Sequence, residues 1–283
     1  MDILLAFTSL TIFTLMLTIG VNQSLEQLTS LLHQRAVLFR ALLAVLVVVP
    51  AVVFTLLLVF DLSPEVATGL ALLAAAPGAP LTTQRSHMVG ANIDYITSLQ
   101  LILALLAIVV TPLILGVFYG MFELTTERVS LLQVAGQIAS VTFLPVIVGM
   151  VLRSFAPKLV AVIGKPLNVL ANVLFLLLVI ALVVVLAIAP DLRVKLLLGW
   201  PAIAAIVIIA VAAVTIGHLL GGPHKDKRAA LAIASLARNV GLAMFIASVS
   251  EDGNGVIPTL LAYILLGTTV QIIYSVWMKR QVT

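Results

Sequence analysis

Long apolar runs separated by short polar connections dominate the chain. A membrane-spanning helix needs roughly 20 mainly apolar residues, and nine segments meet this requirement. The connections are too short to contain a soluble domain. The pattern therefore predicts an all-α polytopic membrane protein that forms a single transmembrane unit over residues 1–283. The nine predicted spans cover residues 3–22, 36–60, 64–90, 92–122, 130–152, 166–190, 196–221, 228–250 and 255–278.

Composition agrees with a membrane location. Hydrophobic residues make up 63% of the chain and charged residues 9%, whereas about 25% of the residues in an ordinary globular protein are charged. The absence of cysteine excludes a disulfide framework and a thiolate metal site, and the four scattered histidines do not suggest structural zinc. The 15 basic residues form no stripe, so we expect no nucleic-acid partner and no cofactor.

The basic residues collect in alternate connections, as the positive-inside rule requires. One set of connections, with the C-terminal tail, holds eleven basic residues, and the other set holds three basic and eight acidic residues. This partition predicts that the N-terminus lies outside and the C-terminus in the cytoplasm, and the short loops suit a bacterial inner membrane. The eleven are Arg35, Arg40, Arg85, Arg153, Lys158, Lys165, Lys225, Lys227, Arg228, Lys279 and Arg280.

The third predicted span is interrupted near its middle. Pro77-Gly78-Ala79-Pro80 lies about 12 residues, or about 18 Å of helix, after Glu65. Two prolines in four residues cannot sit in a regular helix. Broken helices at membrane depth occur only where they are buried in protein or line a cavity, so this break marks a candidate site. The alternative is a kinked helix that serves packing alone.

The eighth predicted span contains a charge. Arg238, within Ser235-Leu236-Ala237-Arg238-Asn239-Val240-Gly241, lies about 15 Å of helix in from the basic cluster at Lys227 and Arg228. An arginine at mid-membrane costs about 2.5–3.5 kcal/mol on insertion scales, so it should face a water-filled cavity, exposed carbonyl groups or a carboxylate. Acidic residues lie almost entirely at the ends of the spans, which makes a carboxylate partner at the midplane hard to find.

The two interrupted regions share one order of features. Residues 64–122 and 226–279 each begin with a charge and continue through a half-helix, an interruption, a second half-helix and a long apolar helix. The charge partition makes the two regions enter the membrane from opposite sides, as an inverted repeat requires. Paired interrupted helices in corresponding positions are typical of the binding site of a secondary transporter.

Four blocks of the sequence follow the order of a known family pattern. They are Met16-Leu17-Thr18-Ile19-Gly20-Val21, Pro64-Glu65-Val66-Ala67-Thr68-Gly69-Leu70 with Ala76-Pro77-Gly78, Leu144-Pro145-Val146-Ile147-Val148-Gly149, and Asn239-Val240-Gly241-Leu242. Together they resemble the bile acid:sodium symporter family. The resemblance implies two crossed broken helices that form the ion and substrate site, packed against a smaller panel of helices. The nine predicted spans resemble a shorter form of this fold, which lacks the first of ten helices.

The sequence departs from the family pattern at the positions that bind sodium. The resemblance places Arg238 and Val45 where the second sodium site has glutamines. It places the following residues at the first site: Thr82, Thr83, Ile96, Gln100 and Ala234. No carboxylate remains among them, although a hard cation usually requires one, and a fixed arginine repels a cation. We therefore expect no metal ion here, because the sodium positions are degenerate at Ala234, Ile96 and Val45.

These observations predict a secondary transporter that carries a small organic anion by alternating access, without the sodium coupling of the family. No catalytic motif lies at membrane depth, so an enzyme is not expected. The alternatives are a sodium-coupled symporter of a bile acid-like anion and a sensor or channel built on a transporter fold. The expected partners are the anion and the lipid bilayer. The predicted substrate-binding residues are Arg238, Asn239, Thr82, Thr83 and Gln100, and the predicted hinge residues of the broken helices are Pro77, Gly78, Pro80 and Gly241.

Overall fold

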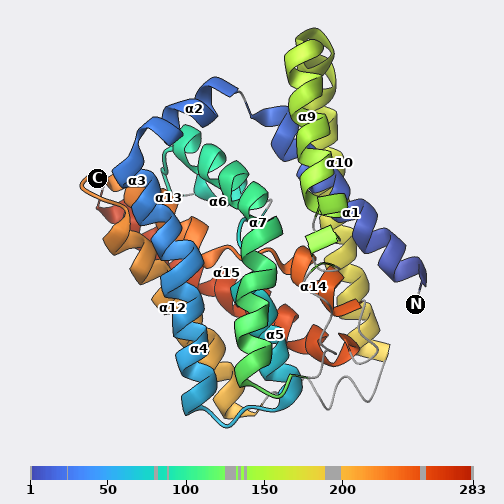
Figure 1. Cartoon of the computed structure of the whole chain (residues 1–283), viewed down its shortest axis with the longest axis vertical. Coiled ribbons are helices and arrows are strands. Elements are labelled where there is room, and N and C mark those ends of the chain that lie inside the picture. Colours follow the sequence, from blue (N-terminus) through green and yellow to red (C-terminus); the bar gives the residue numbers. More distant parts are fainter. Residues whose placement is uncertain are drawn as a thin grey trace.

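The computed structural model describes residues 2–23, 25–79, 82–87, 89–124, 132, 135–136, 139–188, 199–248 and 253–281. In this part of the chain every regular element is a helix (Figure 1). Six described helices are long and apolar enough to cross a membrane: Arg35–Val59, Ile93–Met121, Pro157–Ala181, Trp200–Leu220, Lys225–Ala247 and Ile257–Arg280. Shorter apolar helices overlap the other three predicted spans: Ala6–Asn22, Pro64–Ala75 and Leu144–Phe155. The expected all-α polytopic class is confirmed, whereas the number of nine spans stays a prediction.

The first half of the chain contains α1 (Asp2–Asn22), α2 (Leu25–His33), α3 (Arg35–Leu42), the π-helix η1 (Leu43–Val48), α4 (Val49–Val59), α5 (Pro64–Ala75), α6 (Thr82–His87) and α7 (Ile93–Met121). The second half contains the π-helix η2 (Ala139–Phe143), α9 (Leu144–Phe155), α10 (Pro157–Ile188), α12 (Trp200–Leu220), α13 (Lys225–Leu236), α14 (Val240–Ser248), the 3₁₀ turn η3 (Gly253–Val256) and α15 (Ile257–Arg280).

Two boundaries differ from the sequence-based expectation. Helix α10 begins at Pro157 and not at 166, so Lys158 and Lys165 lie on the helix and not in a connection. Proline at the first helical position has no N–H that could lose a partner, which favours this start. The connection between the first two predicted spans also forms a helix, α2, which follows α1 after a short break.

Capping residues fix where two of the membrane helices begin. The Ser63 hydroxyl accepts a hydrogen bond from the Val66 N–H at 3.5 Å, and Pro64 follows it as the first residue of α5. The Asn92 Oδ1 accepts from the Tyr95 N–H at 2.9 Å and starts α7. Both side chains satisfy N–H groups that have no partner within the helix.

The two broken spans meet at their interruptions. The first comprises α5 and α6, the second comprises α13 and α14, and their breaks lie near the centre of the molecule (Figure 1). The N–H of Asn239 donates to the carbonyl oxygen of Ala76 at 2.9 Å. This backbone hydrogen bond joins one break to the other and confirms the expected crossing.

Helices α1, α9 and α10 form a smaller panel beside the core that contains the crossing. Helix α1 packs chiefly on α9 and α10. A Cβ atom at Gly20 would overlap the carbonyl oxygen of Val146, and one at Gly149 would lie 2.5 Å from the carbonyl oxygen of Leu17. Only glycine at both positions permits this close approach of α1 and α9, which builds the panel as one packed unit.

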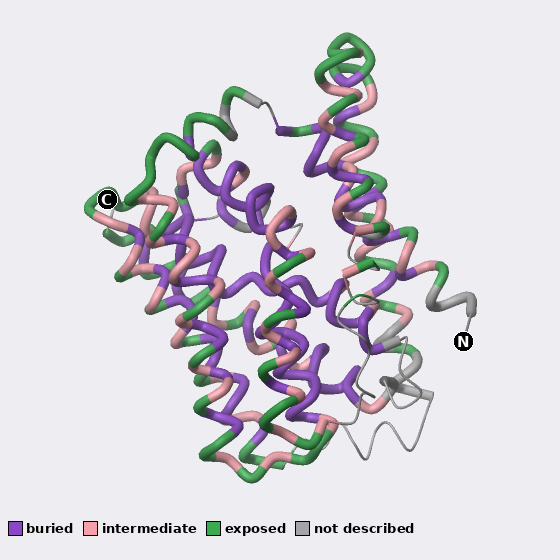
Figure 2. Tube along the Cα trace, viewed as in Figure 1, coloured by how far each residue is buried: buried purple, intermediate pink, exposed green. Residues whose placement is uncertain are grey.

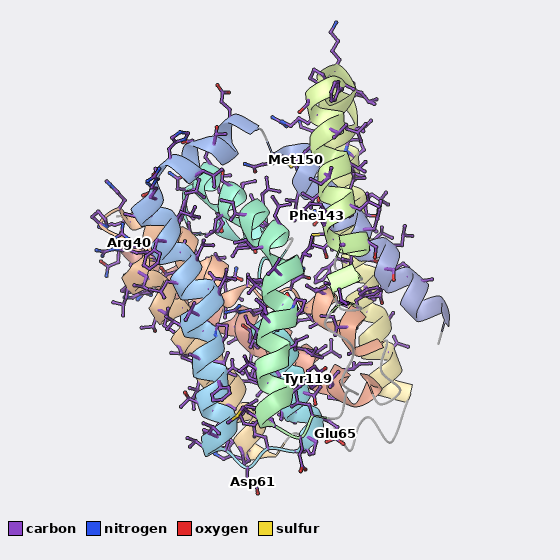
Figure 3. All side chains as sticks on the ribbon, viewed as in Figure 1. Arg40, Asp61, Glu65, Tyr119, Phe143 and Met150 are labelled. Atoms are coloured by element: carbon purple, nitrogen blue, oxygen red, sulfur yellow. The ribbon has the colours of Figure 1, made fainter. Side chains whose placement is uncertain are left out.

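The outer surface of the molecule suits a bilayer. Buried residues concentrate around the crossing, and exposed positions follow the outer faces of the long helices (Figure 2). Large apolar side chains such as Val59 and Leu265 are 72% and 69% exposed, which lipid tails accommodate. Asp61 and Glu65 lie at the lower end of the molecule, and Arg40 lies at its left edge, well above them (Figure 3). The assignment of these residues to opposite sides of the membrane stays a prediction.

Candidate functional site

Prolines free the carbonyl groups that join the two breaks. In an α-helix each carbonyl accepts from the N–H four residues later, and proline has no N–H. Leu73 and Ala76 therefore lose the donors that positions Pro77 and Pro80 would supply, although Pro80 itself lies outside the described residues. The Leu73 oxygen instead accepts from the Ala76 N–H at 3.2 Å, and the Ala76 oxygen accepts from Asn239 at 2.9 Å.

Side chains hold the remainder of the first break. Gly78 has a φ of +76°, a backbone conformation that favours glycine, and a Cβ there would lie 3.1 Å from the Cβ of Leu103. The carbonyl oxygen of Ala79 accepts from Gln100 Nε2 at 2.7 Å and from the Thr82 hydroxyl at 2.5 Å. Thr82 therefore closes the first turn of α6 and lines neither of the two cavities described below.

A polar cavity of about 80 Å³ lies between the panel and the core. On the core side, the Thr83 hydroxyl donates to Gln100 Oε1 at 2.9 Å. All hydrogen-bonding side chains that line the cavity are uncharged: Thr18, Asn22, Thr83, Thr97, Gln100, Asn168 and Asn172. The described lining of the cavity therefore offers hydroxyl and amide groups without a fixed charge.

The sequence reasoning missed the panel side of this cavity. Asn168 and Asn172 lie on α10, and Asn22 donates from Nδ2 to Asn168 Oδ1 at 2.9 Å. Two asparagines four residues apart share one face of a helix. Their spacing within an otherwise apolar span is the signal that could have identified them.

A π-helix leaves free the carbonyl oxygen that Arg238 contacts. In η1 the N–H of Val49 donates to the carbonyl of Ala44, five residues earlier. The next donor in this register would be Pro50, which has no N–H, so the carbonyl of Val45 is left without a backbone donor. Arg238 Nη1 donates to that oxygen at 3.1 Å. The residues that the resemblance placed at the second sodium site therefore do contact each other.

Arg238 is a buried charge beside a second cavity. Its side chain is 4% exposed, and its Nε and Nη2 atoms have no hydrogen-bond partner among the described residues. The cavity has a volume of about 40 Å³ and lies between the crossing, the panel and α15. No carboxylate is among the described residues that line it, so the structure gives Arg238 no acidic partner there.

Asn239 has a structural role and a free donor. Its Oδ1 accepts from the N–H of Leu242 at 3.0 Å and caps α14, whereas its Nδ2 donates to no described residue. Gly241, which the sequence predicts as a hinge, lies inside α14. A Cβ there would be 3.0 Å from Cγ1 of Ile12, so this glycine permits the close approach of α1.

The predicted site residues fall into two neighbouring groups. Arg238 and Asn239 line the smaller cavity, and Thr83 and Gln100 line the polar one. Ala79 connects the two groups, because it lines the first cavity and accepts a hydrogen bond from Gln100. Ala234 and Ile96, which the resemblance places at the first sodium site, are buried in α13 and α7 and carry no side-chain oxygen.

Comparison with known proteins identifies the family. The model of the Sodium Bile acid symporter family matches residues 9–192, which include the first break and end before Arg238. No curated protein matches the chain. Since the match covers more than half of the sequence and the structure contains the crossed breaks, the chain belongs to the sodium bile acid symporter family, whose members are secondary transporters of organic anions or bile acids.

Proposed function

We propose that this protein transports a small organic anion by alternating access and that Arg238 supplies the positive charge at the crossing. One observation carries the proposal: a buried arginine lines the cavity at the crossing, and its Nε and Nη2 atoms have no hydrogen-bond partner in the described part of the chain. A carboxylate accepts hydrogen bonds from two guanidinium nitrogens at once, in the strongest geometry that arginine offers. The Nδ2 of Asn239 and the N-terminal end of the α14 dipole add further positive character.

The same geometry supports transport without sodium. The carbonyl oxygens of Val45, Ala76 and Ala79 each accept from a protein donor. A sodium ion 4 Å from the guanidinium would be repelled by about 4 kcal/mol at an effective dielectric constant of about 20. The positive charge that sodium would contribute is already part of the chain.

The polar cavity is the proposed place for the rest of the anion. Thr83 and Gln100 face it from the core, and Asn168 and Asn172 face it from the panel. Thr82 is proposed to act on the substrate indirectly, because its hydroxyl holds the Ala79 carbonyl of the break.

We further propose that the N-terminus lies outside and the C-terminus in the cytoplasm of a bacterial inner membrane. The eleven-to-three division of basic residues supports this orientation. The short connections between apolar helices suit such a membrane.

Binding of small carboxylates to purified protein tests the proposal. Lactate, pyruvate and succinate are titrated while the melting temperature is followed, because a ligand that binds the folded state stabilises it. We expect at least one of them to stabilise the unmodified protein and Arg238→Gln to weaken its binding at least tenfold, since the charge-assisted pair is lost.

Arg153→Gln is the matched control for this experiment. Arg153 also donates from Nη1 to a backbone oxygen, that of Val21, at 2.9 Å, but it lies on α9 away from the crossing. The control should bind the anion as the unmodified protein does. Equal stabilisation of Arg238→Gln by the same anion would contradict the proposal.

Sodium-coupled transport of a bile acid-like anion is the second candidate, and the family match favours it. It requires a weak cation site formed from backbone carbonyls and Gln100. Uptake that stops when sodium is replaced by choline would support this candidate.

A further inference from the structure

We propose that the protein is an obligatory exchanger, which returns across the membrane only with an anion bound. The inference rests on the proposed function. It adds that outward movement of one anion is coupled to inward movement of another. Its basis is the unbalanced charge of Arg238 at the crossing.

The bound anion is the group that neutralises this charge. Among the described residues, acidic side chains lie at helix ends or in connections, for example Glu65, Asp94 and Asp226 in the first turns of α5, α7 and α13. None of them lines the cavity of Arg238. Counted over the described residues, the site therefore has a charge of +1 when it is empty and a net charge of zero when it holds a monoanion.

The difference in charge between the empty and the occupied site affects how easily the panel closes over the crossing. Alternating access requires a state in which the site is sealed from both sides. In this structure the cavity beside Arg238 measures about 40 Å³, and Ile12, Leu15 and Leu178 of the panel line it. Such a space holds few waters, so an empty site closes over unpaired guanidinium N–H groups, which is strongly unfavourable. With a carboxylate in place, those groups are paired, and closure becomes accessible.

The titratable groups described at this site do not offer a proton route of charge compensation. No histidine or carboxylate is among the described residues that line either cavity, and the arginine itself stays protonated. Tyr263 also lines the cavity of Arg238, but its hydroxyl keeps its proton, because it donates to the carbonyl oxygen of Leu236 at 2.7 Å. The protein with a bound anion therefore reorients faster than the empty protein. As a result, the protein exchanges anions across the membrane and does not carry a net flux of them.

Transport into loaded and unloaded liposomes tests the inference. The probes are ¹⁴C-labelled lactate and pyruvate, and the vesicles contain either the same unlabelled anion or potassium MES. We expect the initial uptake rate to be at least tenfold higher in anion-loaded vesicles. Arg238-dependent uptake at equal rates into both kinds of vesicle would overturn exchange while the proposed function stands. If none of lactate, pyruvate and succinate binds or is taken up under any loading, the proposed function fails, and the inference fails with it.

A second measurement needs no substrate. The chain contains no cysteine, so Asn172→Cys places one thiol in the polar cavity. A membrane-impermeant maleimide added outside right-side-out vesicles labels molecules that face inward only as fast as the empty protein reorients. The labelling of these inward-facing molecules is therefore a slow phase. Its rate should rise at least tenfold when Arg238→Gln is added and should stay low with Arg238→Lys, which keeps the charge. The same rate in all three proteins would overturn the proposal.

Discussion

Three prolines determine where the crossing finds its hydrogen-bond partners. Pro77 and Pro80 free carbonyls of the first break, and Asn239 of the second break donates to one of them. Pro50 acts on a neighbouring helix, where the π-helical register exposes the carbonyl of Val45 to Arg238. At each place a missing N–H permits a contact between segments that are far apart in the sequence.

Gly20 offers a test of panel packing at a single residue. Gly20→Ala should destabilise the protein by about 1–3 kcal/mol, because the new methyl group would overlap the Val146 carbonyl in a packed interface. The melting temperature in detergent measures the effect. Gly120→Ala is the control, since a Cβ at Gly120 meets nothing within 4 Å. A melting temperature as high as that of the control would contradict the described approach of α1 and α9.

The sequence anticipated part of the candidate site residue by residue. Arg238 and Asn239 were predictable because a charge and an amide at mid-membrane require a cavity or a partner. The contact with Val45 O was not predictable from geometry alone, because a π-helical register leaves no mark in the sequence. Asn168 and Asn172 were not predicted, because they lie in the apolar span of α10, which contains no break.

At the scale of elements, the hydropathy pattern predicted the positions of the membrane helices more accurately than the residues at which they begin and end. It predicted a connection up to residue 165, whereas α10 begins at Pro157. Charged residues at Lys158 and Lys165 suggested a loop, but a helix continues beyond the bilayer when its backbone hydrogen bonds are satisfied within the helix. The crossing itself followed from the breaks and from the family resemblance, because a hydrogen bond between residues 76 and 239 is too remote for any local pattern.

The broken third span provides a test at this scale. Replacing Pro77-Gly78-Ala79-Pro80 by four alanines restores N–H groups for Leu73 and Ala76 and favours a continuous helix. The N–H of Asn239 then loses its acceptor. We expect membrane insertion to persist and uptake of the anion to fall by at least tenfold. Insertion is followed by membrane fractionation and transport by uptake in liposomes; undiminished uptake would show that the break is a packing kink.

The whole molecule combines a packed panel, a core with crossed breaks and a cavity between them that contains a fixed positive charge. The crossing is the feature expected of this family. Arg238 lies beyond residues 9–192 that the family model matches, and the resemblance places it at a position where the family binds sodium. We propose that this fixed charge takes the place of the co-transported cation.

The most direct test of this account is the melting temperature of the unmodified protein in sodium chloride and in potassium chloride at constant ionic strength. A ligand stabilises a protein only if it binds the folded state. If Arg238 takes the place of the cation, as we propose, the melting temperature should be the same in both salts over the full range of sodium concentration. A rise that depends on sodium and saturates with its concentration would contradict the account and return the protein to the sodium-coupled members of its family.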